Sequence, residues 1–368
     1  MVKRAFNIVG LSFNLIFVIG LLISGLSVFI SPEKTTIPAI LGMFFLFFML
    51  ANLVFVLYWL MKIKWYFVFS FLALLLMTKN ITNIFPVNKK QPIEASSSGE
   101  IKILSYNVRL FNFYKKNKSE TKNAVLSYII DTDADIVCMQ EFGYGLKNEF
   151  LTRKDILSVL GKKYKYYHIE ISRDYLQDRK NPYGIATFSK HKIVNTKLIE
   201  TPSKDNLAMY TDMKIGDKII RVFNCHLESN QLTHNDRKLV AGLMDSIDKK
   251  ALVQIGGILS KKMSAAFKRR ALQVDKISEV ISQSTLPTFL CGDFNDTPVS
   301  YAYRKMRGSL KDAFAETNTG LGITYNQGLF RFRIDYILHS EGIHPFGFKV
   351  DKVSYSDHYP VYCYFENY

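Results

Sequence analysis

The chain has 368 residues, of which 48% are hydrophobic, and a formal net charge of +16 at pH 7. This length accommodates one large domain and a further segment. No internal repeat or low-complexity stretch is visible, which excludes a repeat architecture. The four cysteines show no CxxC or Cys/His spacing, which excludes a zinc site of that type.

Two uncharged stretches near the N-terminus, Phe6–Ile30 and Thr35–Met61, are long enough to cross a membrane. A hydrocarbon core of ~30 Å needs about 20 apolar residues. A third stretch, Trp65–Met77, reaches that length only when the polar Thr78–Asn83 is included. A cleaved signal peptide is the alternative for the first stretch, but the second apolar run close behind it favours an uncleaved anchor. We therefore expect two to three transmembrane helices, at about 6–30, 37–61 and 65–85.

Lysine and arginine residues in the short loops predict the orientation of these helices. Lys3 and Arg4 precede the first span, and Lys62 and Lys64 follow the second, so both places are expected to be cytoplasmic. With three spans, the chain after Phe85 lies on the outer side of the cytoplasmic membrane. With two spans, it lies in the cytoplasm. We expect three spans and an extracytoplasmic domain in an integral membrane protein of the cytoplasmic membrane.

The cysteines and the basic residues leave the compartment and the partner open. The cysteines lie in apolar, strand-like runs: Cys138, Cys225, Cys291 and Cys363. This position favours buried free thiols over disulfides, and free thiols in turn favour a reducing compartment. Basic clusters recur along the chain, at 115–118, 162–165, 261–262 and 268–270. Each is typical of a solvated face. Together they suit an anionic partner, either nucleic acid or a membrane surface with phosphorylated headgroups.

A polar segment with one proline and three serines, Asn88–Gly99, separates the hydrophobic N-terminus from the rest of the chain. We expect a transmembrane anchor at 1–86, a linker at 87–99 and a single α/β domain at 100–368. Runs rich in β-branched and aromatic residues predict strands: Ile101–Asn107, Asp135–Gln140, Gly184–Ser189, Ile219–Cys225, Thr288–Cys291, Ile334–His339 and Val361–Phe365. Apolar spacings of three and four predict helices: Asn123–Thr132, Asp236–Lys249 and Ala265–Ser282.

Polar side chains stand at the ends of several of these strands, where layered α/β folds gather functional groups. Asn107 ends the first strand and Glu141 follows the second. A glutamate closing so apolar a strand is costly to bury unless it is paired or binds a metal ion. Asp293 and Asn295 follow Gly292, which permits a sharp turn, and would point to the same side of an extended chain. A carboxylate beside a carboxamide can deprotonate water while holding a phosphoryl oxygen.

Two further blocks contain Asp335 and the pair Asp357–His358, so a carboxylate is available to orient an imidazole. For the other polar residues near these blocks, packing in the fold or exposure to solvent is favoured over a direct role in the site. Tyr183 and Arg109 lie near the blocks and are candidates to line the pocket, with packing favoured. Arg270 and Gln273 are candidates to reach the substrate phosphate, with a solvated helix face favoured. The remaining histidines are expected at the surface or in loops: His168, His191, His234, His339 and His344.

In combination, six blocks resemble the endonuclease/exonuclease/phosphatase superfamily, which includes pancreatic deoxyribonuclease, neutral sphingomyelinases and inositol-polyphosphate phosphatases. The blocks SYNV, QEF, NCHLES, GDFNDTP, RIDYI and SDHYPV occur in the order of the family, between Glu100 and Phe365. The resemblance implies a four-layer α/β sandwich, with two face-to-face β-sheets flanked by helices. The N-terminal anchor lies outside it.

The resemblance also implies a role for each site residue. Glu141 is the main metal ligand for Mg²⁺, with Mn²⁺ as a possible substitute, and Asp357 and Asn107 lie close by. Asp293 is the base, Asn295 holds the phosphate, and His358, oriented by Asp335, stabilises the transition state. His226 matches the second histidine of the deoxyribonuclease and sphingomyelinase branches, as a general acid or a phosphate contact. Apurinic endonucleases have asparagine at this position, which makes an abasic-site repair role doubtful.

The sequence therefore predicts a membrane-anchored, metal-dependent hydrolase of phosphate esters, with phosphodiesters favoured. A lipid headgroup or other membrane-associated ester is favoured over nucleic acid. A membrane-tethered nuclease is the alternative, and a catalytically silent binding module is the alternative of another class. Protein partners are not predicted.

Overall fold

The computed structural model describes residues 2–88, 99–112, 123–146, 151–172, 182–203, 205–230, 249–327, 330–366 and 368. These residues form two compact units. Unit 1 contains Met1–Pro86, Asn230–Ala271 and Asp296–Arg304, and unit 2 contains Val87–Ser229, Leu272–Asn295 and Lys305–Tyr368. Most of the predicted linker, the basic cluster at 115–118 and the predicted helix before residue 249 lie outside the described residues.

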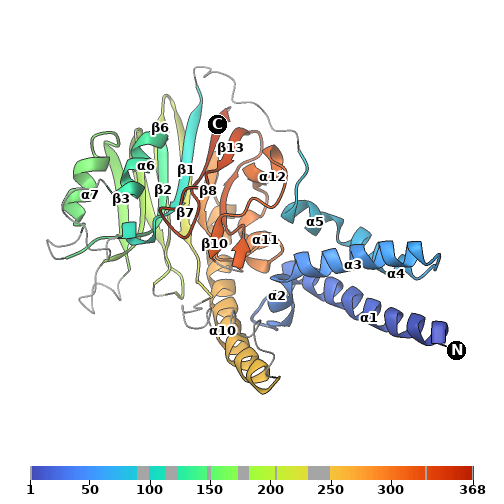
Figure 1. Cartoon of the computed structure of the whole chain (residues 1–368). Helices are drawn as coiled ribbons and strands as arrows, with labels where there is room; N and C mark the ends of the chain where they lie inside the picture. Colours follow the sequence, from blue (N-terminus) through green and yellow to red (C-terminus); the bar gives the residue numbers. More distant parts are fainter. Residues whose placement is uncertain are drawn as a thin grey trace. The chain divides into compact units, whose positions relative to one another are not determined.

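Unit 2 contains two six-stranded sheets (Figure 1). The first has the order β13-β14-β1-β2-β4-β3 and the second the order β5-β6-β7-β8-β12-β9. The first sheet comprises β1 (Ile101–Asn107), β2 (Ile136–Gly143), β3 (Tyr166–Ile171), β4 (Tyr183–Ser189), β13 (His344–Val350) and β14 (Val361–Glu366). The second comprises β5 (Lys192–Ile199), β6 (Ala208–Ile215), β7 (Lys218–His226), β8 (Thr288–Asp293), β9 (Lys311–Asp312) and β12 (Asp335–His339). A short hairpin of β10 (Tyr325–Gln327) and β11 (Phe330–Phe332) stands apart.

The seven predicted strands are all present. Among the strands that the sequence missed, β3, β5, β9 and β13 lie at the edges of their sheets, whereas β6 lies inside. β5, for example, alternates exposed and half-buried residues and carries two lysines. It lies at the edge of its sheet. One face of such a strand meets water, so its sequence lacks a continuous apolar run.

Alternation along the central strands divides their side chains between two cores. In β1, Ile101 and Ile103 pack between the sheets, with Val222 of β7 and Phe289 of β8. Leu104 and Tyr106 lie on the opposite face, in a core that α6 and α7 complete. This period of two follows from the pleat of the strand. Each fully buried aliphatic side chain of this kind contributes about 1.5–3 kcal/mol of transfer free energy.

Helices cover the outer faces of the sandwich. α6 (Ala124–Thr132) and α7 (Arg153–Leu160) bury Ile129 and Leu160 against the first sheet. α7 begins with a capping box, in which the Thr152 hydroxyl accepts from the backbone N–H of Asp155 and the Asp155 carboxylate accepts from that of Thr152. The other helices wholly within this unit are η2 (Arg109–Asn112) and α12 (Ala313–Thr317), while α10 (Lys249–Ser282) and α11 (Tyr301–Arg307) are divided between the two units. The unit is therefore an α/β sandwich with two mixed sheets and flanking helices, as predicted.

The four cysteines lie in the cores of unit 2, as the sequence predicts. All four are buried free thiols. Cys138 and Cys291 belong to the core between the two sheets, as does Cys363. Burial raises the pKa of the Cys225 thiol, so it packs as a small neutral side chain.

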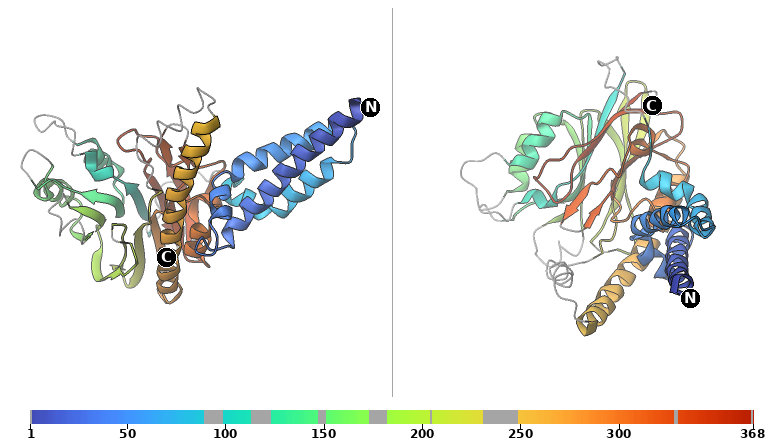
Figure 2. Two further views of the ribbon diagram at one scale, coloured as in Figure 1. Left: turned by 90° about the horizontal axis from the view of Figure 1, so that it is seen from below. Right: turned by 45° about the vertical axis from the view of Figure 1, so that its right-hand side comes forward.

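Unit 1 is built on the N-terminal helices, of which α1, α3 and α4 lie side by side in every view (Figure 2). The helices are α1 (Val2–Gly25), η1 (Leu26–Val28), α2 (Ile37–Gly42), α3 (Phe45–Met61), α4 (Phe67–Leu76) and α5 (Thr78–Ile84). Leu21, Phe45, Ala73 and Val299 form their common core. At Gly42 an added Cβ would lie 2.7 Å from the Ser27 hydroxyl, so glycine is required for this close approach.

The prediction of two to three continuous spans is only partly supported. Among the described residues, one helix, Arg4–Val28, is long and apolar enough to cross a membrane. The pair α4 and α5 would make a second, but it bends by 65°. The bend follows Met77, where the Thr78 hydroxyl bonds the Leu75 carbonyl that the broken helix leaves free. The second predicted span is divided between α2 and the 17-residue α3, about 26 Å long at 1.5 Å per residue.

Candidate active site

Four strand ends of unit 2 place polar groups beside one another. Asn107 ends β1, His226 ends β7 and Asp293 ends β8. Asp335 begins β12, which runs antiparallel to β8, so it lies at the same edge. In the register of the second sheet, Asp293 is paired directly with both His226 and Asp335.

A β-bulge directs Glu141 towards this edge. Strand alternation places Cys138 in the core between the sheets and Met139 in the outer core, so an uninterrupted β2 would point residue 141 outwards. Between Met139 and Phe142, β2 contains one residue more than the segment of β4 that it pairs with. Glu141 lies in this bulge and has a φ of 50°. The Asn107 side-chain amide donates to Glu141 Oε1 at 3.3 Å. The bulge therefore re-aims the carboxylate, a common role of bulges near functional sites.

Asp293 lies at the centre of the site and is buried. Its Oδ2 accepts from the Asn107 side-chain amide at 3.0 Å, and its Oδ1 accepts from the backbone N–H of Asn295 at 2.8 Å. Burial raises the pKa of Asp293, while the charge of His358 opposes that shift. Gly292 precedes it with a φ of 155°, and a Cβ there would collide with the Cys225 carbonyl of β7. Glycine thus allows two strands to approach closely, rather than forming the turn that the sequence suggested.

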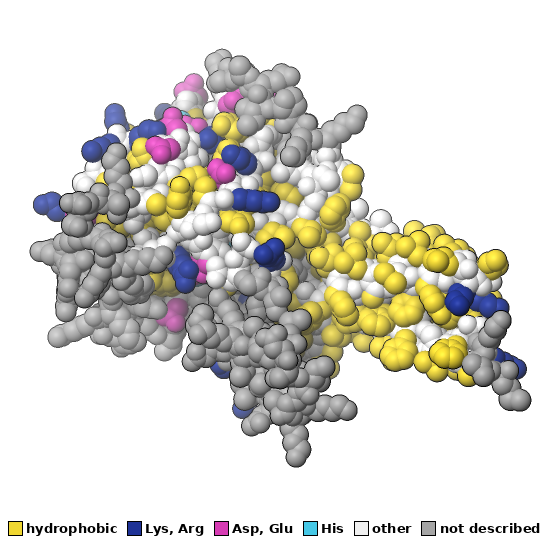
Figure 3. Space-filling view, in the orientation of Figure 1, with side chains coloured by type: hydrophobic (Ala, Val, Ile, Leu, Met, Phe, Trp, Pro, Cys, Tyr) yellow, Lys and Arg dark blue, Asp and Glu magenta, His cyan; other side chains and the backbone are white. Residues whose placement is uncertain are grey.

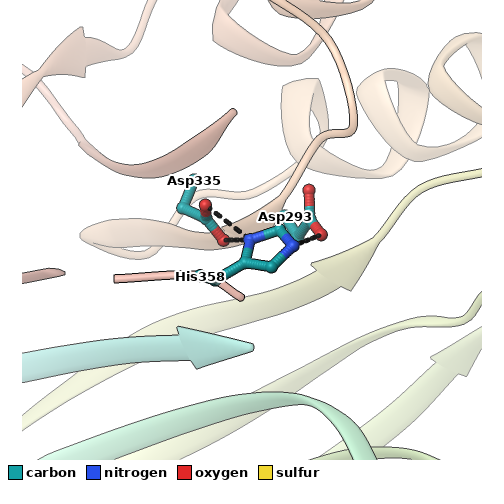
Figure 4. Close-up of side chains that lie close together, drawn as sticks. All are labelled: Asp293, Asp335 and His358. Atoms are coloured by element: carbon teal, nitrogen blue, oxygen red, sulfur yellow. Dashed lines mark hydrogen bonds and ion pairs between the residues drawn. The ribbon is translucent and has the colours of Figure 1, made fainter. Parts of the chain in front are cut away.

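His358 is held between two carboxylates (Figure 4). Its Nδ1 lies 2.9 Å from Asp335 Oδ2, and its Nε2 lies 3.6 Å from Asp293 Oδ2. Desolvation alone would lower the pKa of His358, but the charges of Asp335 and Asp293 outweigh it and raise the pKa to about 10. The ring is therefore an imidazolium at neutral pH, with Nε2 facing Asp293.

His226 has the opposite electrostatic environment. It is buried, and its Nε2 lies 3.7 Å from Asp293 Oδ2. Its Nδ1 lies 3.1 Å from the Tyr183 hydroxyl of β4. Burial lowers the pKa of His226 to about 4, although Asp293 opposes the shift. The ring is therefore neutral at pH 7. Tyr183, for which the sequence favours packing over a place in the pocket, is a direct partner of a site histidine, and no local sequence signal marks it.

Asn295 departs from the predicted extended conformation. Its φ is 51°, and its side-chain amide donates to the Leu227 carbonyl at 2.8 Å. Because this left-handed residue bends the chain, Asp293 and Asn295 do not project as alternate residues of a strand. The Asn295 backbone N–H instead holds the Asp293 carboxylate.

Glu141, Asp357 and Asn107 form an acidic corner of the site. Burial and the negative charge of Asp357 raise the pKa of Glu141 to about 7. The Arg109 guanidinium lies 3.6 Å from Asp357, with half of its side chain exposed. Two carboxylates and a carboxamide are oxygen donors of the kind that hard divalent cations prefer. Such a cation would offset the desolvation and repulsion at Glu141, so these residues fit the predicted metal site.

A second group within metal-ligand distance consists of Asp293, Asp335 and His358. In this group His358 Nδ1 is already engaged by Asp335, and the ring is positively charged. A cationic imidazole cannot ligate a metal ion, because ligation needs its neutral form. The three side chains are better described as an imidazolium that is hydrogen-bonded to Asp335 and ion-paired with Asp293.

Three predictions about residues away from this centre are wrong. Arg270 is buried and ion-paired with Asp296 at 2.9 Å, rather than solvated. Gln273 is also buried, and its side-chain carbonyl accepts from the backbone N–H of Glu228 at 2.7 Å. His339 lies inside β12, 3.2 Å from a carboxylate oxygen of Glu316. Sequence periodicity does not identify these partners, because they come from distant segments.

Comparison with protein families identifies the family of this chain. The model of the endonuclease/exonuclease/phosphatase family matches residues 104–358. The chain belongs to the endonuclease/exonuclease/phosphatase family. As a member it is a hydrolase of phosphate esters. A second model, a domain of unknown function (DUF8431), matches residues 5–84. A comparison with curated proteins gave no match.

Two solved structures with TM-scores above 0.5 share this fold. An endonuclease/exonuclease/phosphatase from Beutenbergia cavernae has a TM-score of 0.51 at 14% identity and covers 73% of this chain and 72% of its own. A family protein from Leptotrichia buccalis has a TM-score of 0.51 at 18% identity, covering 72% and 98%. Sphingomyelinase C from Streptomyces griseocarneus has a TM-score of 0.46 at 15% identity, covering 73% and 100%. At these identities the similarity concerns the fold.

The contact between His358 and Asp335 leads to a testable expectation for this family member. His358→Ala and Asp335→Ala should each lower kcat by about 10²-fold, the scale of losing transition-state electrostatic help. The double variant should be no slower than the slower single variant, because each residue acts through the other. Steady-state kinetics on a chromogenic diester measure this. A double variant slowed by about 10⁴-fold would mean that the two residues act independently.

Proposed function

We propose that the chain is a membrane-anchored phosphodiesterase that uses Mg²⁺, or Mn²⁺ in its place, and acts on a lipid or another membrane-associated phosphate ester. Residues 1–86 are the anchor, 87–99 the linker and 100–368 the catalytic domain. The observation that carries the chemistry is the position of Asp293 between the Nε2 atoms of His226 and His358, at 3.7 and 3.6 Å.

Asp293 is the proposed general base. It is buried and its pKa is raised by burial, which makes its carboxylate a stronger proton acceptor than a solvated one. Asn107 and the Asn295 backbone fix the orientation of both carboxylate oxygens. In the proposed step, Asp293 takes a proton from a water molecule that attacks the phosphorus atom in line.

The two histidines bind the phosphate in different protonation states. The imidazolium of His358 places a full positive charge where the phosphorane gains negative charge. His226 is neutral at pH 7, and a neutral imidazole is too weak an acid to protonate the leaving oxygen, which takes its proton from solvent water. We therefore assign it the role of a hydrogen-bond donor from Nε2, with the Tyr183 hydroxyl donating to Nδ1 and fixing that tautomer. Asn107 and Asn295 are the proposed additional phosphate contacts.

Glu141, Asp357 and Asn107 are the proposed ligands of the divalent cation. When bound, the cation neutralises the phosphoryl oxygens and favours departure of the leaving group. The chain's own contribution is to hold these oxygen donors at one place. The β-bulge at Glu141 and the hydrogen bond from Asn107 perform that task.

The distribution of polarity in α1, α3 and α4 supports the membrane anchor. Their exposed surface is largely hydrophobic (yellow in Figure 3) and includes Phe13, Ile16, Phe47 and Val54. Their polar groups are buried between the helices: Asn14 Nδ2 donates to Ser70 Oγ, Ser70 Oγ donates to Asn52 Oδ1, and Trp59 Nε1 donates to Asn14 Oδ1. A water-soluble bundle has the reverse arrangement. Interhelical hydrogen bonds of this kind are typical of helices packed in lipid.

The same contacts support three passes through the membrane. Trp59 of α3 meets Asn14 of α1, and Asn52, earlier in α3, donates to the carbonyl of Phe17, later in α1, so α1 and α3 run antiparallel. The Asn80 side chain of α5 donates to the Gly25 carbonyl, so α4 and α5 return to the end where α1 finishes. The basic residues in the first turn of α1 (Lys3 and Arg4) and after α3 (Lys62 and Lys64) share the opposite end, which the positive-inside rule makes cytoplasmic. The catalytic domain is then extracytoplasmic.

A fusion experiment tests this topology. A reporter that is active only outside the cytoplasm, attached after Tyr368, should be active, whereas one that is active only in the cytoplasm should be silent. The same pair attached to a truncation ending at Lys64 should give the reverse result, which serves as the control. A full-length fusion active only in the cytoplasm would mean that α4 and α5 do not cross.

A lipid or membrane-associated ester is the proposed substrate class. The predicted tether of about a dozen residues reaches roughly 40 Å at full extension, so the domain meets headgroups at high effective concentration. The sequence also lacks a regular aromatic and basic stripe for stacking bases.

A competition assay tests the function. Full-length protein in detergent would be incubated with Mg²⁺, mixed phospholipid vesicles and supercoiled plasmid, and headgroup release and nicking followed together. We expect headgroup release that EDTA abolishes. Efficient nicking without lipid turnover would instead identify a membrane-held nuclease.

A further inference from the structure

A polar cavity lies beside the phosphate-binding residues, and apart from the proposed metal ligand Asp357 its described lining has no part in the proposed mechanism. Its volume is about 200 Å³, which is room for roughly seven water molecules at about 30 Å³ each. Its described lining consists of charged, amide and hydroxyl side chains, among them Arg109, Asn112, Asn326, Tyr355 and Asp357. Tyr325, next to Asn326, forms a β-bridge with His358. A group in the cavity would therefore adjoin a phosphate held by His358.

One wall of the cavity is a strained turn. Four consecutive residues that are not glycine, Arg109–Asn112, have φ values between 44° and 54°. L-residues rarely adopt this conformation in succession. The turn is held by the Asn107 side chain, which accepts from the Arg109 N–H at 3.1 Å, and by the buried side chain of Phe111. Arg109 and Asn112, at the two ends of the turn, line the cavity. The fold therefore retains an unfavourable backbone conformation at the place where it positions these two polar side chains.

The lining indicates what kind of group fits. Among the described residues it includes no aliphatic side chain, so a hydrocarbon group would gain little there. Arg109 and Asp357, both in the lining, lie 3.6 Å apart as an ion pair, so the described lining presents no unpaired negative charge to attract a quaternary ammonium group. Such a group also needs several aromatic faces. The Tyr359 hydroxyl is engaged by the Asn326 amide. Amides and hydroxyls donate to and accept from alcohol groups, so the complementary ligand carries several hydroxyls.

We propose that this cavity binds a polyhydroxylated group, such as glycerol or an inositol ring, that is attached to the reacting phosphate. The inference rests on the proposed function, because it names the substrate class of the same site. Lipid headgroups and soluble sugar or polyol phosphates share this chemistry. Choline esters would place a quaternary ammonium group in the cavity, so we expect them to bind more weakly than polyol esters.

Ligand binding tests the cavity separately from catalysis. Thermal unfolding of full-length protein in detergent with Mg²⁺ would be followed during titration with glycerol 3-phosphate, inositol 1-phosphate, phosphocholine and inorganic phosphate. Ligand that binds the folded state raises the midpoint according to its Kd. We expect the two polyol phosphates to bind at least about tenfold more tightly than phosphocholine or inorganic phosphate, the scale of one or two hydrogen bonds.

Variants connect that selectivity to the cavity. Asn326→Ala and Arg109→Ala should reduce the affinity for polyol phosphates to the level of inorganic phosphate. Lys154→Ala, an exposed position on α7, is the matched control and should keep the selectivity.

Vesicles of phosphatidylcholine, with or without phosphatidylglycerol, serve as competitors. Competition only by the phosphatidylglycerol vesicles identifies a lipid source, and no competition identifies a soluble polyol phosphate.

The outcomes separate the two proposals. Phosphocholine binding as tightly as the polyol phosphates, or selectivity that persists in Asn326→Ala, overturns the cavity assignment. Hydrolysis of bis(p-nitrophenyl) phosphate by the same preparation reports on the proposed function alone. Selective binding without any such hydrolysis would leave the cavity assignment intact and refute the phosphodiesterase.

Discussion

Replacing Asp293 with asparagine should lower kcat by at least about 10²-fold, the usual contribution of a positioned general base. The carboxamide keeps the shape of the side chain, and its Oδ1 can still accept from the Asn295 backbone N–H. It cannot take a proton from water. The variant should therefore fold and lose turnover, with little change in KM.

Steady-state kinetics on a chromogenic diester, together with thermal unfolding, measure both effects. Asp217→Asn makes the same chemical change in the exposed turn between β6 and β7, and is the control for the substitution itself. Turnover by Asp293→Asn close to that of the control would remove Asp293 as the base. A large fall in the unfolding midpoint would mean that the carboxylate is chiefly structural.

Glu141→Gln should reduce activity by orders of magnitude and remove the response to Mg²⁺. The substitution takes away the negative charge that the β-bulge brings into the site but keeps a side chain that can contact Asn107. A neutral carboxamide is a weaker ligand for a hard cation than a carboxylate. EDTA treatment of the unaltered protein should produce a loss of the same order.

Metal binding gives a readout of Glu141→Gln that does not depend on turnover. Mg²⁺ that binds the folded state should raise the unfolding midpoint of the unaltered protein, and this shift should disappear in the variant. Glu341→Gln is the matched control, since Glu341 is 83% exposed and its ion pair with Lys311 contributes little. An unchanged Mg²⁺ shift in Glu141→Gln would refute the metal assignment.

The largest corrections to the sequence prediction concern the N-terminal helices. The apolar runs predicted continuous spans, because periodicity and length are the only signals in such runs. The break after Gly42 depends on close contact with Ser27, and the bend after Met77 places Asn80 against the Gly25 carbonyl. These contacts join segments far apart in the chain, so local composition does not predict them.

The sequence by itself determined the family, the central strands and the candidate site residues of this protein. Strand patterning is local: alternating and β-branched residues follow from the pleat, and the polar residues at strand ends stand out against apolar runs. Asn107, His226 and Asp293 are therefore recognisable as candidates from the order of residues along the chain.

The tertiary structure decided how those residues are used. Only the bulge in β2 turns Glu141 inwards, because the pleat alone would point it away. Only the packing of β4 against the site gives His226 the Tyr183 hydroxyl as partner, and only the two carboxylates around His358 make it cationic while burial leaves His226 neutral. The physical reason is that desolvation and charge–charge interactions depend on distances between residues that the chain order does not specify.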